Sequence, residues 1–341
     1  MRRRAVVIGP YEYGTDSGID GYSWIGASAH EYGELLTGDP MWGPGSCRVL
    51  EPAELQTADG VMAALQEVAD QTEPDDVLLV VYVGHGAYWS DLPGGQVHFS
   101  VGSSQKDKPW TWLSSWYIYR TMRGSRANLK VLIADCCYAN LLPQLSEKSA
   151  IPEILGRLDR GTCVLTATTD AHLMDAKGCS NLPGRFPGCT PFSGHLMNVL
   201  SNGTTDYESQ LTLGMVRDAL RDEMQNCQDA VHDMPKMLLN NAREREPLFT
   251  NHMDPERRND APVMPVGPED WAHRLRRDSR LSLSFLLRDP GTAGDVVAHL
   301  YQTTDEANRD IARNIHDAAN NNYTPDEFAR YWNRVEPTLR A

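Results

Sequence analysis

Two reactive side chains stand just past the ends of two apolar runs in this chain. His85 follows the run 77–83, and Cys137 follows the run 131–134. Short apolar runs without polar alternation are typical of strands buried on both faces of a parallel sheet. Because ligands gather at the carboxyl ends of parallel strands, we expect the imidazole and the thiol to meet at one edge of the sheet. A cysteine beside a histidine is a candidate nucleophile and general base.

The residues around His85 and Cys137 predict the strands and helices of the fold. Predicted strands alternate with predicted helices, which favours an α/β fold with right-handed crossovers and a mostly parallel sheet. The predicted strands are 5–8, 47–50, 77–83, 131–134 and 163–167, and the predicted helices are 27–36, 57–71 and 113–123. The segment 9–26 is predicted as a glycine-rich loop, and the segment 92–112 as a hairpin or loop.

The pattern changes in the last part of the chain. Three prolines and a glycine between 262 and 268 are typical of a linker. Helical patterns follow it, over 269–288, 292–302, 304–320 and 325–338. We therefore predict a domain over 1–255, a linker over 256–268 and a small helical region over 269–341. Thr324 is the expected cap of the last helix, with Pro325 at its first position.

Composition excludes several classes of function. The net charge of −14 over 341 residues opposes binding to nucleic acid or to an anionic membrane. The apolar runs are too short to cross a bilayer, and the run 5–8 is too short for the core of a signal peptide. The seven cysteines are odd in number and show no disulfide-like spacing. We therefore expect the protein to reside in a reducing cytoplasm. Because the sequence has no C-x-x-C pair, we expect no metal site.

Five segments together resemble one known family, and the first is 48–50 (Arg-Val-Leu), which resembles an early strand of its bacterial members. The segment 82–86 (Tyr-Val-Gly-His-Gly) resembles the strand-end His-Gly motif of caspases and metacaspases, and 135–137 (Asp-Cys-Cys) resembles the metacaspase Asp-x-Cys motif. The histidine and the second cysteine of these motifs are 52 residues apart, close to the caspase spacing of about 50. The segments 161–169 and 191–200 resemble the family's next strand and the helix after it. The resemblance covers about 4–250 and implies a caspase-like three-layer sandwich.

The resemblance also implies a role for each site residue. Cys137 would be the nucleophile and His85 the base, with the backbone N–H groups of Gly86 and Cys137 stabilising the oxyanion. Asp135 would line the primary pocket and select Arg or Lys before the scissile bond, because a carboxylate pairs well with a guanidinium fork. The first loop and the helix after it supply further candidates for this pocket: Asp16, Asp20, His30 and Glu31.

The function that follows is a cysteine endopeptidase acting on protein or peptide substrates with a basic residue at the cleavage site. By resemblance, it would serve regulated proteolysis in bacterial defence or programmed cell death, and the C-terminal helices would bind a regulatory partner. No cofactor is expected, although several metacaspases use calcium. The main alternative is a catalytically inactive scaffold, because 138–140 reads Tyr-Ala-Asn where metacaspases have His-Ser-Gly. A redox pair of Cys136 with Cys137 is disfavoured, since adjacent cysteines rarely form an unstrained disulfide.

Overall fold

The computed structural model describes thirteen stretches of the chain: 1–89, 96–142, 162–167, 179, 182, 186–205, 208–227, 236–239, 246–253, 267–277, 283, 286–303 and 305–340. The chain divides into two compact units, Met1–Ala261 and Pro262–Ala341. Among the described helices, none is both long and apolar enough to cross a membrane.

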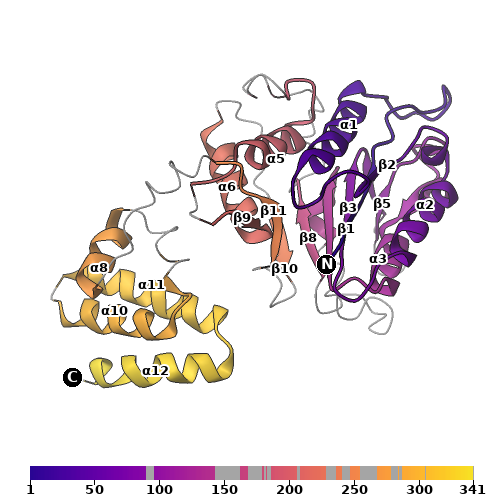
Figure 1. The fold of residues 1–341 in the computed structure, drawn as a ribbon. Coiled ribbons are helices and arrows are strands. Elements are labelled where there is room, and N and C mark those ends of the chain that lie inside the picture. The colour runs from indigo at the N-terminus through magenta and orange to yellow at the C-terminus, as the bar shows by residue number, and fades with distance from the viewer. Residues whose placement is uncertain are drawn as a thin grey trace. The chain divides into compact units, whose positions relative to one another are not determined.

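A six-stranded sheet forms the centre of the first unit, in the order β10-β8-β7-β3-β1-β2 (Figure 1). Neighbours from β8 to β2 pair in parallel, and β10 pairs antiparallel with β8. The strands are β1 Arg3–Ile8, β2 Cys47–Val49, β3 Val77–Val83, β7 Leu129–Asp135, β8 Thr162–Thr166 and β10 Lys236–Leu239. Every residue of β3 and β7 is buried, which agrees with their lack of polar alternation.

Helices cover both faces of this sheet. One apolar layer joins the sheet to α1, α5 and α6, and a second layer joins its other face to α2 and α3. These helices are α1 Ser23–Gly38, α2 Ala58–Asp70, α3 Ser115–Gly124, α5 Pro191–Asn202 and α6 Leu213–Asn226. Within β3, Val81 belongs to the first layer and its neighbour Tyr82 to the second, as the alternation of side chains along a strand requires. The predicted α/β class, with three layers and a mostly parallel sheet, is confirmed.

Smaller elements differ from the predicted pattern. Helix α1 begins at Ser23, inside the predicted loop 9–26, and its N-cap Tyr22 makes no side-chain capping bond that the sequence could have signalled. The predicted hairpin or loop 92–112 contains β5, the middle strand of an antiparallel sheet β4-β5-β6. The remaining elements of this unit are β4 Gly86–Trp89, β5 Gln96–Phe99, β6 Leu113–Ser114, β9 Gln210–Thr212, β11 Pro247–Thr250, and the short 3-10 helices Glu54–Gln56, Pro109–Thr111 and Ala139–Leu141.

The second unit is helical where it is described. Its helices are α8 Pro268–Arg277, α10 Pro290–Gln302, α11 Glu306–Asn322 and α12 Pro325–Leu339, and they share one apolar core. The Thr324 hydroxyl accepts the Glu327 N–H, and the Glu327 carboxylate accepts the Thr324 N–H, so the predicted cap of α12 is confirmed. Most of the predicted linker 256–268 lies outside the described residues.

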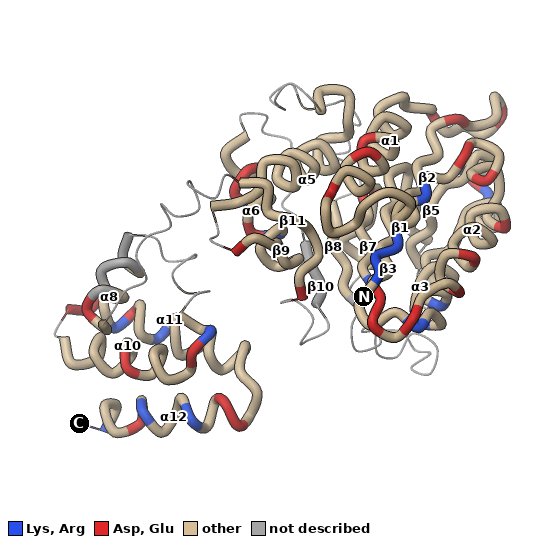
Figure 2. Tube along the Cα trace, in the orientation of Figure 1, with Lys and Arg blue, Asp and Glu red and all other residues tan. Residues whose placement is uncertain are grey.

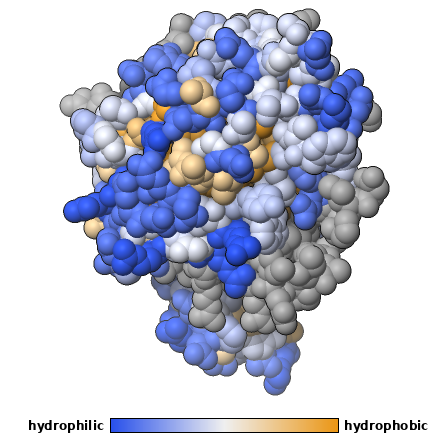
Figure 3. Space-filling model, turned by 90° about the vertical axis from the view of Figure 1, so that its right-hand side faces the viewer, coloured by the Kyte–Doolittle hydropathy of each residue, from blue (hydrophilic) through white to orange (hydrophobic). Residues whose placement is uncertain are grey.

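Charged residues of both signs are spread over the described helices rather than gathered in one place (Figure 2). In Figure 3, the face of the first unit on the side of α2 and α3 is mainly hydrophilic, with a small apolar area near its middle. The largest exposed apolar side chains of the chain include Trp110, in a 3-10 helix, and Tyr117, in α3. Isolated exposed apolar residues of this kind are ordinary on a protein surface.

Candidate active site

Strands β3 and β7 end level with each other at one edge of the sheet. Val83 pairs with Asp135, and the Gly84 N–H donates to the Asp135 carbonyl oxygen at 3.0 Å. The two candidate catalytic residues, His85 and Cys137, each stand two positions beyond the Val83–Asp135 pair. The register of two neighbouring parallel strands therefore delivers the imidazole and the thiol to the same edge.

The backbone of Gly86 lies against that of Cys137. A Cβ atom on Gly86 would overlap the Cys137 carbonyl oxygen and would stand 3.0 Å from the Cys136 Sγ. Only glycine permits this approach. The backbone N–H groups of Gly86 and of Cys137 itself favour the thiolate and act to lower the pKa of the Cys137 thiol. Two backbone donors therefore converge beside the sulfur, and they are the two donors that the sequence analysis assigned to an oxyanion site.

The imidazole of His85 is held by one carbonyl group and two aromatic rings. Its Nε2 lies 2.8 Å from the carbonyl oxygen of Asp20. Because a carbonyl oxygen can only accept, Nε2 carries the hydrogen and the neutral ring keeps its lone pair on Nδ1. The ring centroids of Tyr13 and Tyr22 lie 5.7 Å and 5.4 Å from that of His85. Burial lowers the pKa of His85, against the smaller opposing effects of the Asp20 carbonyl and carboxylate.

The backbone of His85 is fixed by residues that the sequence analysis missed. Its carbonyl oxygen accepts the Tyr82 hydroxyl at 2.7 Å and the Ser100 N–H at 3.0 Å. The Ser100 hydroxyl in turn lies 2.9 Å from the Tyr82 hydroxyl and 2.8 Å from that of Tyr13. Tyr13 and Ser100 are 87 residues apart in the chain, so no local spacing could have indicated the network.

The two adjacent cysteines have different surroundings. Cys136 is fully buried in the apolar layer of α2 and α3, whereas Cys137 is partly exposed. Burial raises the pKa of both thiols, and for Cys137 the N–H groups beside the sulfur oppose that rise. Both thiols therefore favour the protonated form at neutral pH, and Cys137 needs a base to become a nucleophile.

The turn after Cys137 is built without the glycine of the metacaspase pattern. Tyr138 has φ 60°, the one positive φ among the described non-glycine residues. The left-handed conformation costs such a residue about 1–2 kcal/mol. The ring of Tyr138 packs against that of Tyr88 in β4, with centroids 6.1 Å apart, and the Ala139 N–H donates to the Cys136 carbonyl oxygen at 3.3 Å. Local packing and hydrogen bonding thus hold the turn in place.

Asp135 is buried, with 4% of its surface exposed. Its Oδ2 accepts three hydrogen bonds: from the Thr190 hydroxyl at 2.5 Å, from the Ser193 hydroxyl at 2.6 Å and from the Ser193 N–H at 3.2 Å. Both partners belong to the N-terminal end of α5, where backbone N–H groups favour negative charge. Burial raises the pKa of Asp135, and the bonds from Ser193 and Thr190 oppose that rise.

The other predicted pocket residues lie in different surroundings. Asp16 and His30 are exposed. Asp20 is exposed as well, and its backbone carbonyl oxygen, rather than its carboxylate, hydrogen-bonds with His85. The structure therefore gives Asp20 a part in orienting the imidazole that the sequence analysis did not foresee.

Glu31 lies on the same side of the sheet as Asp135. Burial raises the pKa of the Cys189 thiol to about 11, and the carboxylates of Glu31 and Asp135 both add to that rise, against a hydrogen bond with Ser28. Both carboxylates thus raise the pKa of the same thiol. Two of the predicted pocket acids, Glu31 and Asp135, therefore act on the same thiol.

No family model and no curated protein matches this chain. Among solved structures, the chain is similar to a protein from Geobacter sulfurreducens, with 12% identity and a TM-score of 0.48, over 74% of this chain and 100% of that one. It is also similar to caspase-1 from Spodoptera frugiperda, with 13% identity and a TM-score of 0.43, over 70% of this chain and 86% of that one. The chemistry of the site rests on the residues of this chain.

Proposed function

We propose that this chain is a cysteine endopeptidase in which Cys137 is the nucleophile and His85 the general base. The observation that carries the proposal is that β3 and β7 end at paired residues, Val83 and Asp135. His85 and Cys137 each follow two positions later, at the same edge of the sheet. The close approach of Gly86 to Cys137 supports it, since two backbone N–H groups converge beside the sulfur. The hydrogen bond from His85 Nε2 to a carbonyl oxygen supports it further, because it leaves Nδ1 as the basic atom.

The proposed reaction uses these groups in sequence. The Nδ1 of His85 takes the proton of the Cys137 thiol, and the sulfur attacks the carbonyl carbon of the scissile bond. The N–H groups of Gly86 and Cys137 stabilise the negative charge that forms on the carbonyl oxygen. The intermediate then expels the amine, which takes the proton from His85. Water hydrolyses the resulting thioester and restores the thiol.

The dyad is expected to rest as a neutral thiol and a neutral imidazole, which sets the pH dependence of activity. Burial lowers the pKa of His85 from its ordinary value of 6.5. We therefore expect kcat/KM to rise with pH as His85 loses its proton, with the midpoint of this acidic limb below 6.5. A fluorogenic peptide assayed across a pH series checks this, and an acidic midpoint above the ordinary histidine value would contradict it.

We propose further that Asp135 selects Arg or Lys at the cleavage site. The three hydrogen bonds that it accepts from described residues all reach Oδ2, so Oδ1 is the atom that would meet a guanidinium. The carboxylate of Glu31, which acts on the same Cys189 thiol as Asp135, would add a second negative charge. A bound guanidinium would favour the ionised form of Asp135 and offset the cost of its burial.

Gly86→Ala tests the close backbone approach at the site. We expect the variant to lose about 1–3 kcal/mol of unfolding free energy, because the added methyl group overlaps the backbone of Cys137. Peptidase activity should fall to the level of the uncatalysed reaction. Gly14→Ala is the matched control, since a Cβ at Gly14 would meet nothing within 4 Å. Urea denaturation measures both variants, and equal stabilities would contradict the packing described for Gly86.

Fluorogenic peptides ending in Arg, Lys or Asp test the proposed function as a whole. We expect the full chain to release the reporter after Arg and Lys, and not after Asp. Turnover after Asp alone would support a peptidase activity but contradict the proposed specificity for Arg and Lys. Absence of turnover with every peptide, with and without added calcium, would favour the inactive scaffold.

A further inference from the structure

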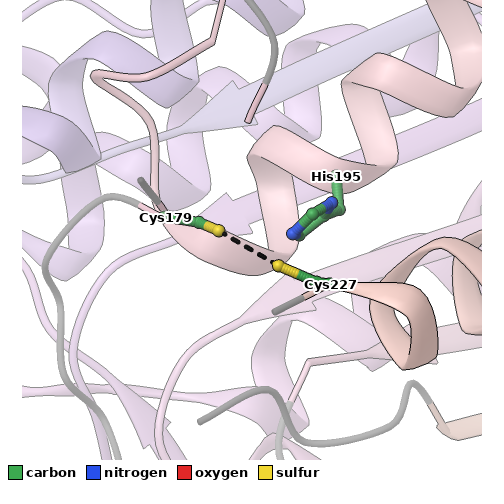
Figure 4. A group of neighbouring side chains, drawn as sticks. All are labelled: Cys179, His195 and Cys227. Atoms are coloured by element: carbon green, nitrogen blue, oxygen red, sulfur yellow. Dashed lines mark hydrogen bonds between the residues drawn. The ribbon is translucent and has the colours of Figure 1, made fainter. Parts of the chain in front are cut away.

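Two cysteines and a histidine meet away from the proposed dyad. Cys179, His195 and Cys227 each offer one ligand atom, and these three atoms all lie within 4.8 Å of one another. The two Sγ atoms are 3.4 Å apart. In Figure 4, one ring nitrogen of His195 points toward the cysteines. His195 belongs to α5, and Cys227 directly follows the last residue of α6.

The other ring nitrogen of His195 is held by an acid. Nδ1 lies 2.7 Å from Oε1 of Glu223 on α6, and the Asn198 side-chain amide donates to the same oxygen at 2.9 Å. An ionised carboxylate accepts hydrogen bonds, so Nδ1 carries the hydrogen and Nε2 presents its lone pair to the sulfurs. His195 is only 3% exposed. A buried histidine oriented in this way by a carboxylate is the usual arrangement behind a metal ligand.

We propose that Cys179, His195 and Cys227 bind a zinc ion, with a fourth position that no described residue fills. Thiolate and imidazole are the donors that zinc prefers in proteins. Sulfur ligands at about 2.3 Å from a tetrahedral zinc stand about 3.8 Å apart, so the observed 3.4 Å separation needs only a small adjustment. Binding replaces the two thiol protons, which leave to solvent, and the neutral imidazole binds without losing a proton.

The ion would join three segments that are far apart in the chain. It would link α5, the end of α6 and the segment of Cys179. The first turn of α5 also carries Ser193, which hydrogen-bonds with Asp135. Zinc would therefore help to hold the helix that positions Asp135. The site uses neither Cys137 nor His85, so it stands whether or not the chain is a peptidase.

The prediction of no metal site rested on the absence of short ligand spacings in the sequence. The three ligands are 16 and 32 residues apart, whereas the spacings that signal a structural zinc site place two ligands within about four residues. Packing of α5 against α6 brings the histidine and Cys227 together, and that contact is not visible in local spacing.

Zinc content of the purified full-length chain tests the proposal. We expect one zinc per chain after dialysis for the wild type, and a loss of at least about tenfold in affinity for Cys227→Ser. Cys47→Ser is the matched control, because Cys47 is a partly exposed cysteine in β2, and it should keep its zinc. Glu223→Gln keeps all three ligands and should weaken binding by about 10–100-fold.

Cobalt provides a readout that does not depend on activity or on a variant that folds. The wild-type chain loaded with Co²⁺ is expected to absorb in the near ultraviolet through charge transfer from thiolate to metal. Equal zinc affinity of wild type and Cys227→Ser would overturn the site, and so would a cobalt complex without this absorption. An intact mass lower by two hydrogens, with a peptide linking Cys179 to Cys227 before reduction, would overturn the zinc site and show that the two cysteines form a disulfide.

Discussion

Replacing Cys137 with alanine is expected to lower kcat/KM by about 1,000-fold or more, because it removes the sulfur that forms the acyl-enzyme. The fold should tolerate the change, since Cys137 is partly exposed and stands in the turn after β7. Cys136→Ala is the matched control, because it removes the same atoms from the neighbouring position. Cys136 is fully buried, so we expect a loss of about 1 kcal/mol in stability and little loss of activity.

Initial rates with an arginine peptide, and urea denaturation of each variant, separate these effects. We expect opposite profiles: an inactive but stable Cys137→Ala and an active but less stable Cys136→Ala. An active Cys137→Ala, with loss of activity in Cys136→Ala instead, would assign the nucleophile to the other cysteine. Equal rates for both variants and the wild type would show that neither thiol takes part in the reaction.

Asp135→Asn is expected to lower kcat/KM for arginine and lysine peptides by about 100-fold, because a guanidinium would lose its charged partner. The asparagine side chain has nearly the same shape and keeps one oxygen to accept the bonds from Thr190 and Ser193. Asp16→Asn is the control, since Asp16 is an exposed acid in the first loop. A loss that is equal for basic and neutral peptides would indicate a structural role for Asp135 rather than a role in specificity.

The same substitution has an expected signature in stability. Burial raises the pKa of Asp135 in the folded chain above its ordinary value of 3.8, so the folded state holds this proton more tightly than the unfolded state. Stability of the wild type relative to Asp135→Asn is therefore expected to fall as pH rises from 3.8 through the raised folded pKa, and then to stay level. Denaturation at a series of pH values measures this difference. A relative stability that rises over this range would mean that the hydrogen bonds to Asp135 lower its pKa by more than burial raises it.

The central sheet could be predicted from the sequence because its signal is local. The runs that became β3 and β7 are short, apolar and bounded by turn residues, and burial on both faces leaves them without polar alternation. The parallel pairing then placed the strand ends at one edge. Helix α12 was predicted with its cap because Thr324, Pro325 and Glu327 form a capping signal within four residues.

The parts that could not be predicted depend on contacts between distant segments. The start of α1 carries no capping side chain, so nothing local indicated it. The partners of Asp135 on α5 lie 55 and 58 residues away in the chain. His195 and Cys227 of the proposed zinc site come together through the packing of α5 against α6. In each case tertiary structure brings together side chains whose separation along the chain carries no pattern.

Labelling with a peptidyl-arginine acyloxymethyl ketone, an electrophile that reacts with an activated thiol, tests whether His85 activates Cys137. Tandem mass spectrometry of the digested chain locates the adduct among the seven cysteines. We expect the adduct on Cys137, at a rate that falls sharply in His85→Ala. An adduct on any other cysteine, or a rate at Cys137 unchanged by the loss of His85, would contradict the pairing of this thiol with this imidazole.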